Sequence, residues 1–220
     1  MVYYLPIWFQ AVHGVSPLQS GIDNIPLILA QVLASLAAGF LTTIKGYYMP
    51  FVLASSILMA VGAGMLTTFT LNTSTGQWIG YQIIFGAGSG FGFQHAITAA
   101  QAVLPIHDIP SGVSAVLFIQ LLGGALMVSV AQNVFANRLV SGLSRIHGLD
   151  AQVVVAAGAT GLRGLITDPG NLQAALRVYN DALVAAFRVS LITACLSALG
   201  AMGMEWKSVK KGKSSDAIEG

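Results

Sequence analysis

Long hydrophobic stretches separated by short polar connections dominate the sequence. Five of these stretches reach the length of about 20 apolar residues that a helix needs to cross a bilayer core, and they cover about residues 22–44, 50–69, 78–104, 111–136 and 179–204. Their apolar residues run continuously rather than alternating, which favours helices over strands. Because only helices and closed barrels satisfy the backbone inside lipid, the pattern predicts an all-α, polytopic transmembrane bundle.

The remaining segments predict how this bundle is organised. Residues 1–10 are apolar but too short for a span, so we interpret them as the end of a truncated, partial first span. Residues 11–206 would form the bundle, with a long outer loop at 137–178 and a polar cytoplasmic tail at 207–220. Inside the loop, residues 150–166 are apolar and interrupted by glycines, which predicts a helix at the interface or over the mouth of the bundle.

Charges beside the spans bear on orientation. The tail carries four lysines, and the positive-inside rule therefore places it in the cytoplasm and the 137–178 loop outside. Four arginines in that loop oppose this orientation: Arg138, Arg145, Arg163 and Arg177. Asn72 opens the triplet Asn72-Thr73-Ser74 in an outer connection and is therefore a candidate for glycosylation.

The composition supports a lipid environment. Hydrophobic residues make up 55% of the chain and charged residues 8%, whereas soluble domains carry about 25% charged residues. The lipid bilayer is therefore the expected partner. A net charge of +2 without a basic, aromatic-rich patch excludes nucleic acid as a partner. Cys195 is the only cysteine, which excludes an internal disulfide and a cysteine-based metal site.

Amide and hydroxyl side chains inside the stretches are the candidates for a substrate pathway. Gln94, Thr98 and Gln101 recur at helical spacing on one face of the third stretch. Such amides suit a cavity for amphipathic organic molecules, and they equally suit hydrogen bonds between helices, worth about 0.6 kcal/mol on average. For Gln31 and Gln120, in the first and fourth stretches, bonding between helices is the favoured interpretation.

Two ionisable side chains join this list of candidates. His95 can relay a proton near neutral pH, or it can pack as a neutral, hydrogen-bonded residue. Arg188 lies near the middle of the last stretch, where insertion of a charge costs about 2.5–3.5 kcal/mol. Arg188 either lines a water-filled path or pairs with another helix. Asp181 lies seven residues earlier, on the same face and about 10 Å away, so both can line one cavity.

Closely spaced glycines suggest tight packing between helices. The spacing in the third stretch is not G-x-G-x-x-G, and no strand precedes it, which argues against a nucleotide-binding loop. Glycines four residues apart let helices approach closely. We expect this packing role for Gly86, Gly88, Gly90, Gly92, Gly123 and Gly124.

Catalytic chemistry finds no support in the sequence. His13, His107 and His147 do not form a ligand cluster, and on the predicted topology they lie on different sides of the membrane. No nucleophile motif is present. The sequence therefore predicts no catalytic residues, no metal site, no cofactor and no enzyme.

Several motifs together resemble one family of membrane proteins. They are Tyr3-Tyr4-Leu5-Pro6-Ile7-Trp8-Phe9-Gln10, Gly14-Val15-Ser16-Pro17, Ser20-Gly21-Ile22, Gly46-Tyr47-Tyr48 with Pro50, Gly86-Ala87-Gly88-Ser89-Gly90, Gln101, Leu122-Gly123-Gly124, Tyr179-Asn180-Asp181-Ala182-Leu183 and Glu205-Trp206-Lys207-Ser208-Val209-Lys210. Over nearly the whole chain, these motifs resemble the carboxy-terminal half of fungal major facilitator superfamily transporters of the fourteen-span drug:proton antiporter type.

The resemblance implies alternating access, with substrate held between two halves near the middle of the membrane. It implies efflux of small organic molecules, drugs or toxins, with a small organic substrate, protons and a missing amino-terminal half as partners. A multi-pass protein of the plasma membrane is expected, with the vacuolar membrane as the alternative. Two other hypotheses stay open: a non-transporting membrane fragment that needs a partner half, and a membrane-embedded enzyme.

Overall fold

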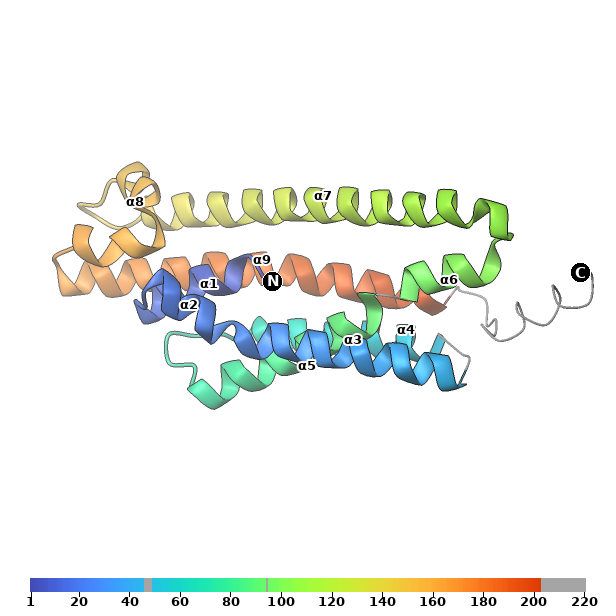
Figure 1. Ribbon diagram of the computed structural model, residues 1–220. Coiled ribbons are helices and arrows are strands. Elements are labelled where there is room, and N and C mark those ends of the chain that lie inside the picture. The colour runs from blue at the N-terminus through green and yellow to red at the C-terminus, as the bar shows by residue number, and fades with distance from the viewer. Residues whose placement is uncertain (46–48, 94, 203–220) are drawn as a thin grey trace, which may run out of the picture.

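Helices account for all the regular secondary structure in residues 1–45, 49–93 and 95–202, which are the residues described by the computed structural model. The predicted all-α fold is therefore confirmed. Five long helices lie side by side along one axis (Figure 1), and they are α3 (Ile25–Lys45), α4 (Met49–Leu66), α5 (Thr75–Phe93), α7 (Ile109–Leu143) and α9 (Pro169–Met202).

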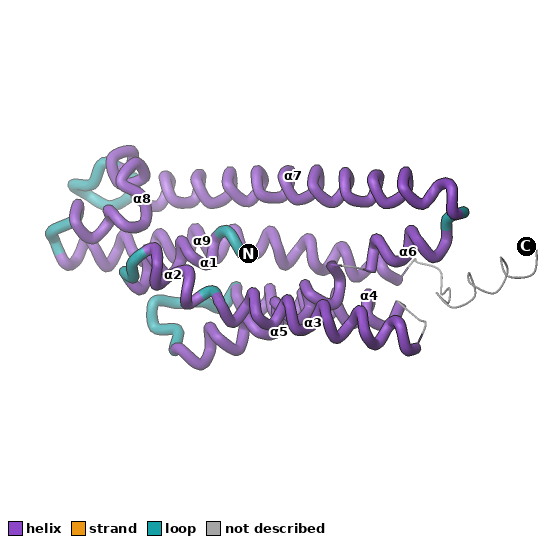
Figure 2. The backbone as a smooth tube through the Cα atoms, in the orientation of Figure 1, coloured by secondary structure: helices purple, strands orange, loops and turns teal. Residues whose placement is uncertain are grey.

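Shorter elements close the two ends of this bundle. Figure 2 shows them as helical segments joined by short loops. They are α1 (Tyr4–Trp8), the π-helix η1 (Phe9–His13), α2 (Pro17–Asp23), α6 (His95–Val103), the 3-10 helix η2 (Ile106–Asp108) and α8 (Ala151–Leu165). The motifs expected at residues 46–48 and 205–210, and the predicted tail at 207–220, lie outside the described residues.

Prolines mark where many of the helices begin. A proline has no N–H to donate and a fixed φ, so the first turn of a helix is where it is best tolerated. Five of the prolines occupy the first or second position of a helix: Pro17, Pro26, Pro50, Pro110 and Pro169. Side-chain caps complete some starts, because Ser16 accepts from the amide of Gln19 at 3.2 Å and Asp150 from that of Gln152 at 2.8 Å.

The third hydrophobic stretch, expected at residues 78–104, is occupied by α5 and α6, which are described on either side of residue 94. α6 leads to the start of α7 (Figure 1). Gln94 lies outside the described residues, and Thr98 and Gln101, the other members of the predicted common face, lie on α6.

Aromatic side chains form the centre of the core at the end of the bundle that carries α8. Trp8 packs against Phe69 with ring centroids 4.4 Å apart, and Phe9 packs against Trp78 at 4.9 Å. Phe187 of α9 meets Phe69 edge-on at 6.0 Å. This cluster brings α1, α5 and α9 together, because large buried rings contribute most of the packing area in such a core.

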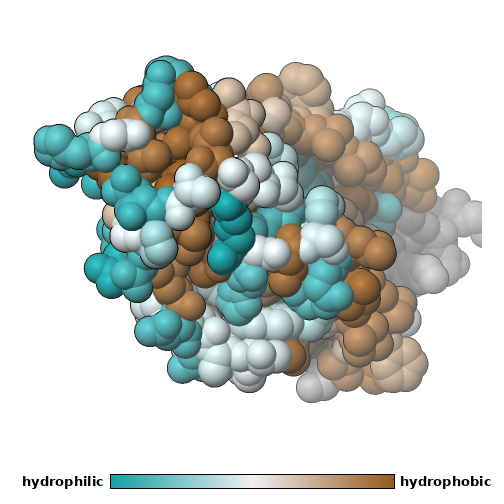
Figure 3. All heavy atoms as spheres, turned by 90° about the vertical axis from the view of Figure 1, so that its left-hand side faces the viewer, coloured by the Kyte–Doolittle hydropathy of each residue, from teal (hydrophilic) through white to brown (hydrophobic). Residues whose placement is uncertain are grey.

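Four helical segments in the described residues are long and apolar enough to cross a membrane: Pro17–Ile44, Met49–Leu66, Ile106–Leu143 and Pro169–Ala201. α5 is not among these four segments. It is as long as α4, but its glycines and glutamines lower its mean hydropathy. Figure 3 views the end that carries α8, where hydrophilic residues gather, while hydrophobic residues cover much of the flank behind it. A polar end and an apolar flank are the surface expected of a bundle embedded in lipid.

Candidate functional site

Two adjoining cavities lie between α7 on one side and α4, α5 and α9 on the other. They share Met59 of α4 and Ser197 of α9, so they follow one another along the bundle. We refer to these two cavities together as the α7 cavities. Transporters of the helical-bundle kind hold their ligands between helices, which makes these cavities the first candidate for a substrate pathway.

The first cavity is the more apolar of the two and has a volume of about 250 Å³. Aromatic, sulfur-containing and small hydroxyl side chains all contribute to its lining. Its lining consists of Met1, Tyr3, Tyr4, Met59, Phe85, Met127, Val128, Ala131, Val189, Ser190, Thr193, Ala194 and Ser197. Methionine adapts its shape to different apolar partners, so this wall suits varied hydrophobic molecules.

The second cavity has a volume of about 440 Å³, and all its hydroxyl groups are serine side chains. Its lining consists of Val52, Ser55, Ser56, Met59, Ser89, Gly92, Phe93, Gln120, Ser197, Gly200 and Ala201. Among the residues that the structure describes, no charged side chain lines either of the α7 cavities. A ligand that carries a full charge would find no counter-ion in the lining of these two cavities.

Several hydroxyl groups of the α7 cavities donate their protons to backbone carbonyls. Ser55 donates to the carbonyl of Gly88 at 2.7 Å, and Ser197 to that of Ala194 at 2.8 Å. Thr193 donates to the carbonyl of Val189 at 2.9 Å. A hydroxyl whose proton is engaged still offers oxygen lone pairs. These side chains therefore present acceptors to a ligand that brings its own donor.

Among the side chains predicted to line a pathway, Gln120 lines the second of the α7 cavities. Gln31 is half-buried and Gln101 is exposed, and neither lines the α7 cavities. Thr98 is half-buried on α6. Gln94 lies outside the described residues.

His95 is buried at the start of α6, with 2% of its surface exposed. Its Nε2 lies 3.2 Å from Oγ1 of Thr42, and its ring stacks on Phe51 with centroids 5.6 Å apart. No acidic side chain is among these contacts. The described geometry is that of a hydrogen-bonded, stacked histidine that joins α3, α4 and α6.

Arg188 and Asp181 line one groove between α7 and α9, and this groove is separate from the α7 cavities. The sequence predicted that these two side chains can share a cavity, and the structure places both on its wall. Arg138 of α7 and Arg145, in the turn that follows α7, also line it. The groove is therefore strongly charged, in contrast to the uncharged α7 cavities.

Glycines of α5 contact two neighbouring helices in alternation. A methyl group at Gly86 would meet the carbonyl oxygen of Leu27 in α3, and one at Gly90 that of Gln31. A methyl group at Gly88 would lie 2.5 Å from the amide nitrogen of Met59 in α4. The pair Gly86 and Gly90 thus packs on α3, and Gly88 together with Gly92 packs on α4.

Gly123 and Gly124 behave differently from the α5 glycines. No heavy atom within the described part of the chain lies within 4 Å of a methyl group placed at either position. α7 stands apart from α3, α4 and α5 in Figure 1, so these glycines meet no neighbouring helix there. The packing role expected for them is not seen in the described residues.

Asn72 is exposed in the turn between α4 and α5, as is Ser74. The intervening Thr73 is buried, and its hydroxyl holds the turn by accepting from the amide of Thr70 at 2.8 Å. Asn72 is therefore accessible from solvent at the end of the bundle that carries α8.

Two buried amides were not among the predicted site residues. Asn180 accepts from Nε1 of Trp8 at 2.9 Å and donates to the carbonyl of Phe69 at 3.0 Å. Gln82 is fully buried and donates through Nε2 to the carbonyl of Asp23 at 3.0 Å. One signal was available for Gln82, since it lies four residues before Gly86 and thus on the face that packs on α3.

Relatives with known names place this architecture in a family. The chain is 54% identical over 211 residues to the MFS-type efflux pump MFS1 of Arthroderma benhamiae, covering 96% of the chain and 39% of that relative. It is 47% identical to the efflux pump aflT of Aspergillus parasiticus over 97% of the chain and 42% of the relative. The chain corresponds to the carboxy-terminal half of a major facilitator superfamily transporter.

A third major facilitator relative gives the same picture. The MFS-type transporter phomT of Diaporthe leptostromiformis is 45% identical, over 96% of the chain and 36% of its own length. The chain thus spans about two fifths of the length of these curated relatives. No family model and no solved structure matches it.

The resemblance predicted from the sequence motifs is confirmed, and the chain is an integral membrane protein. The relatives that it matches are named as efflux pumps or transporters.

Proposed function

We propose that the chain forms the carboxy-terminal half of an exporter of small organic molecules, and that its α7 cavities contact the substrate. The observation that supports this proposal is the pair of adjoining, uncharged cavities inside a membrane bundle. Three relatives named as efflux pumps or transporters support the direction and the class of activity.

The lining of the α7 cavities favours a neutral, largely apolar substrate. Methionine and aromatic side chains provide the apolar surface, as Met59, Met127 and Phe85 illustrate. The hydroxyl oxygens in the lining can accept hydrogen bonds, so a substrate with a few hydroxyl or amine groups could donate hydrogen bonds to them. A drug or toxin of this character fits better than an inorganic ion.

An amino-terminal half is part of the same proposal, because the chain covers only about two fifths of the relatives. Substrate would be held between the two halves near the middle of the membrane. A proton gradient would drive export, as the resemblance implies, and the plasma membrane is the expected location. Neither of the α7 cavities carries an acidic side chain, so proton binding would take place elsewhere in the assembled transporter.

A cell accumulation assay tests the proposal with Nile red, a neutral fluorescent dye. Cells would express the chain alone or together with the amino-terminal part of the Arthroderma benhamiae relative. Met59→Trp fills the point that the α7 cavities share, and Ile57→Trp is the matched control on the exposed face of the same helix.

The proposal expects lower dye accumulation when both parts are present and inserted. Met59→Trp should abolish this reduction, and Ile57→Trp should keep it. Reduced accumulation with the chain alone would show that the half transports by itself. Unchanged accumulation with both parts correctly inserted would contradict export of this class of compound, and equal effects of the two tryptophans would contradict the assigned pathway.

A further inference from the structure

A charged groove runs between α7 and α9 near the end that carries α8, and it has a volume of about 590 Å³. Four ionisable side chains line it: Arg138, Arg145, Asp181 and Arg188. We call it the arginine groove. It shares no lining residue with the α7 cavities, so the proposed transport pathway does not account for it.

The ends of two helices bring these charges together. Arg138 lies in the last turns of α7, and Arg145 lies in the turn that follows the end of α7 at Leu143. Asp181 and Arg188 are seven residues apart on α9, which is about two turns or roughly 10 Å, so they share a face of it. A close contact between Gly142 and Val178 fixes the two helices side by side at this level. Both sets of charges therefore border the same space.

The charges of the arginine groove do not neutralise one another. In the described parts of the chain, the salt bridge found is the one between His107 and Asp108, so none of the four groove side chains is held in such a pair. Three guanidinium groups and one carboxylate leave a surplus of two positive charges. This surplus attracts an anion.

Arg188 lies near the middle of the last hydrophobic stretch, within the candidate span Pro169–Ala201. A charge at membrane depth needs a partner or water, because lipid tails cannot solvate it. An anion that pairs with Arg188 would therefore be held at the level of the bilayer.

Apolar side chains form part of the remaining wall of the arginine groove. Ile146, Val178 and Val184 line it beside the charged side chains. A free inorganic anion would leave this surface without a partner. A molecule with an anionic head and a hydrocarbon chain would cover both kinds of wall.

We propose that the arginine groove binds a membrane lipid with an anionic phosphate headgroup. The guanidinium groups would hold the phosphate oxygens with charge-assisted hydrogen bonds, and an acyl chain would lie on the apolar wall. Basic pockets between transmembrane helices take such headgroups in other membrane proteins. The proposal is independent of the transport activity proposed above.

The test follows the thermal unfolding of the full 220-residue chain in a neutral detergent. Three probes are compared: dihexanoyl phosphatidic acid, dihexanoyl phosphatidylcholine and inorganic phosphate. The protein variants are the double substitution Arg138→Gln with Arg188→Gln, and Asp181→Asn. Arg177→Gln is the matched control, since Arg177 is exposed on α9 and does not line the groove.

Phosphatidic acid should raise the Tm of the unaltered chain and of Arg177→Gln, and the other two probes should not. The double substitution should lose this shift, whereas Asp181→Asn should enlarge it because it removes the one negative charge. A shift of equal size with inorganic phosphate would overturn the assignment to a lipid. A shift that is absent, or that the double substitution retains, would overturn the site. Opposite responses of the two variants cannot come from damage to the fold.

Discussion

The indole Nε1 of Trp8 donates a hydrogen bond of 2.9 Å to the side-chain oxygen of Asn180, and both side chains are buried. Asn180 also donates to the carbonyl of Phe69 at 3.0 Å. One amide therefore connects α1, α9 and the connection that follows α4. Buried polar groups are costly when they lose their partners, so this contact should matter for stability.

Replacement of Asn180 by alanine should destabilise the chain. It leaves the Trp8 indole and the Phe69 carbonyl unpaired, at a cost of about 1–3 kcal/mol for each buried group. Thermal unfolding in detergent measures the change. Asn137→Ala is the control, because Asn137 is exposed on α7. Similar losses of stability in both variants would contradict the role assigned to Asn180.

Alanine substitutions at two glycines of α5 should have opposite effects. Gly88→Ala brings a methyl group to 2.5 Å from the backbone of Met59, and separating the helices should cost about 1–3 kcal/mol. Gly80→Ala meets nothing within 4 Å and should gain up to about 1 kcal/mol from helix propensity. The free energies of unfolding of both variants test this, and a stable Gly88→Ala would show that α4 and α5 can separate freely.

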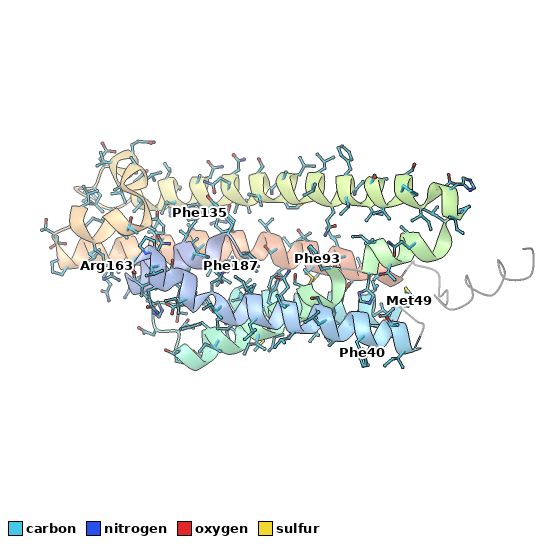
Figure 4. All side chains as sticks on the ribbon, in the orientation of Figure 1. Phe40, Met49, Phe93, Phe135, Arg163 and Phe187 are labelled. Atoms are coloured by element: carbon cyan, nitrogen blue, oxygen red, sulfur yellow. The ribbon has the colours of Figure 1, made fainter. Side chains whose placement is uncertain are left out.

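Arg163 should hold α8 in place over the bundle. Its Nη2 donates to the carbonyl of Val12 at 2.8 Å, and the residue lies where α8 meets η1 (Figure 4). In Arg163→Gln, we expect the backbone amides of residues 151–165 to exchange hydrogen faster, while those of α3 to α5 stay unchanged. Arg177→Gln serves as the control for loss of a positive charge. Unchanged exchange over α8 would contradict the anchoring role.

The folded chain should become less stable as the pH falls, because of the protonation of His13. Partial burial lowers the pKa of His13 below 6.5, Arg163 acts in the same direction, and Asp23 opposes it. The unfolded chain therefore takes up a proton before the folded chain does. The contribution of His13 to the free energy of unfolding is complete above pH about 6.5, and it is lost as the pH falls below this value.

Thermal unfolding between pH about 7.5 and about 5 measures this loss. The drop in Tm should be smaller in His13→Gln than in the unaltered chain. His107→Gln is the control, because His107 is exposed and lies in η2, between α6 and α7. Identical pH profiles for the unaltered chain and His13→Gln would rule out a contribution from this histidine.

Hydropathy predicts the described helices best where the bilayer sets their length. α3 and α4 occupy Ile25–Lys45 and Met49–Leu66, close to the stretches 22–44 and 50–69. α8 occupies Ala151–Leu165, in the segment where an interfacial helix was expected. α9 begins at Pro169, ten residues before the stretch at 179–204, because a helix can continue beyond lipid when its start is capped. There, Asp168 accepts from the amide of Asn171 at 2.7 Å.

Which polar residues face inward depends on the neighbouring helices rather than on the residue type. Gln82 is fully buried because its face of α5 packs on α3, whereas Gln101 on α6 is exposed. The α7 cavities depend on how far α7 stands from α4 and α5, and a single sequence does not contain this spacing.

The glycine contacts of α5 have a mechanical consequence. Where Gly86 and Gly90 lie on α3, and Gly88 on α4, backbone touches backbone, and no side-chain rotamer is available to absorb a shift. These three helices must therefore translate and rotate as one rigid body. The boundary between these helices and α7 is where the bundle can move most easily. A ligand in the α7 cavities would therefore have a rigid group of helices on one side and a more mobile helix on the other.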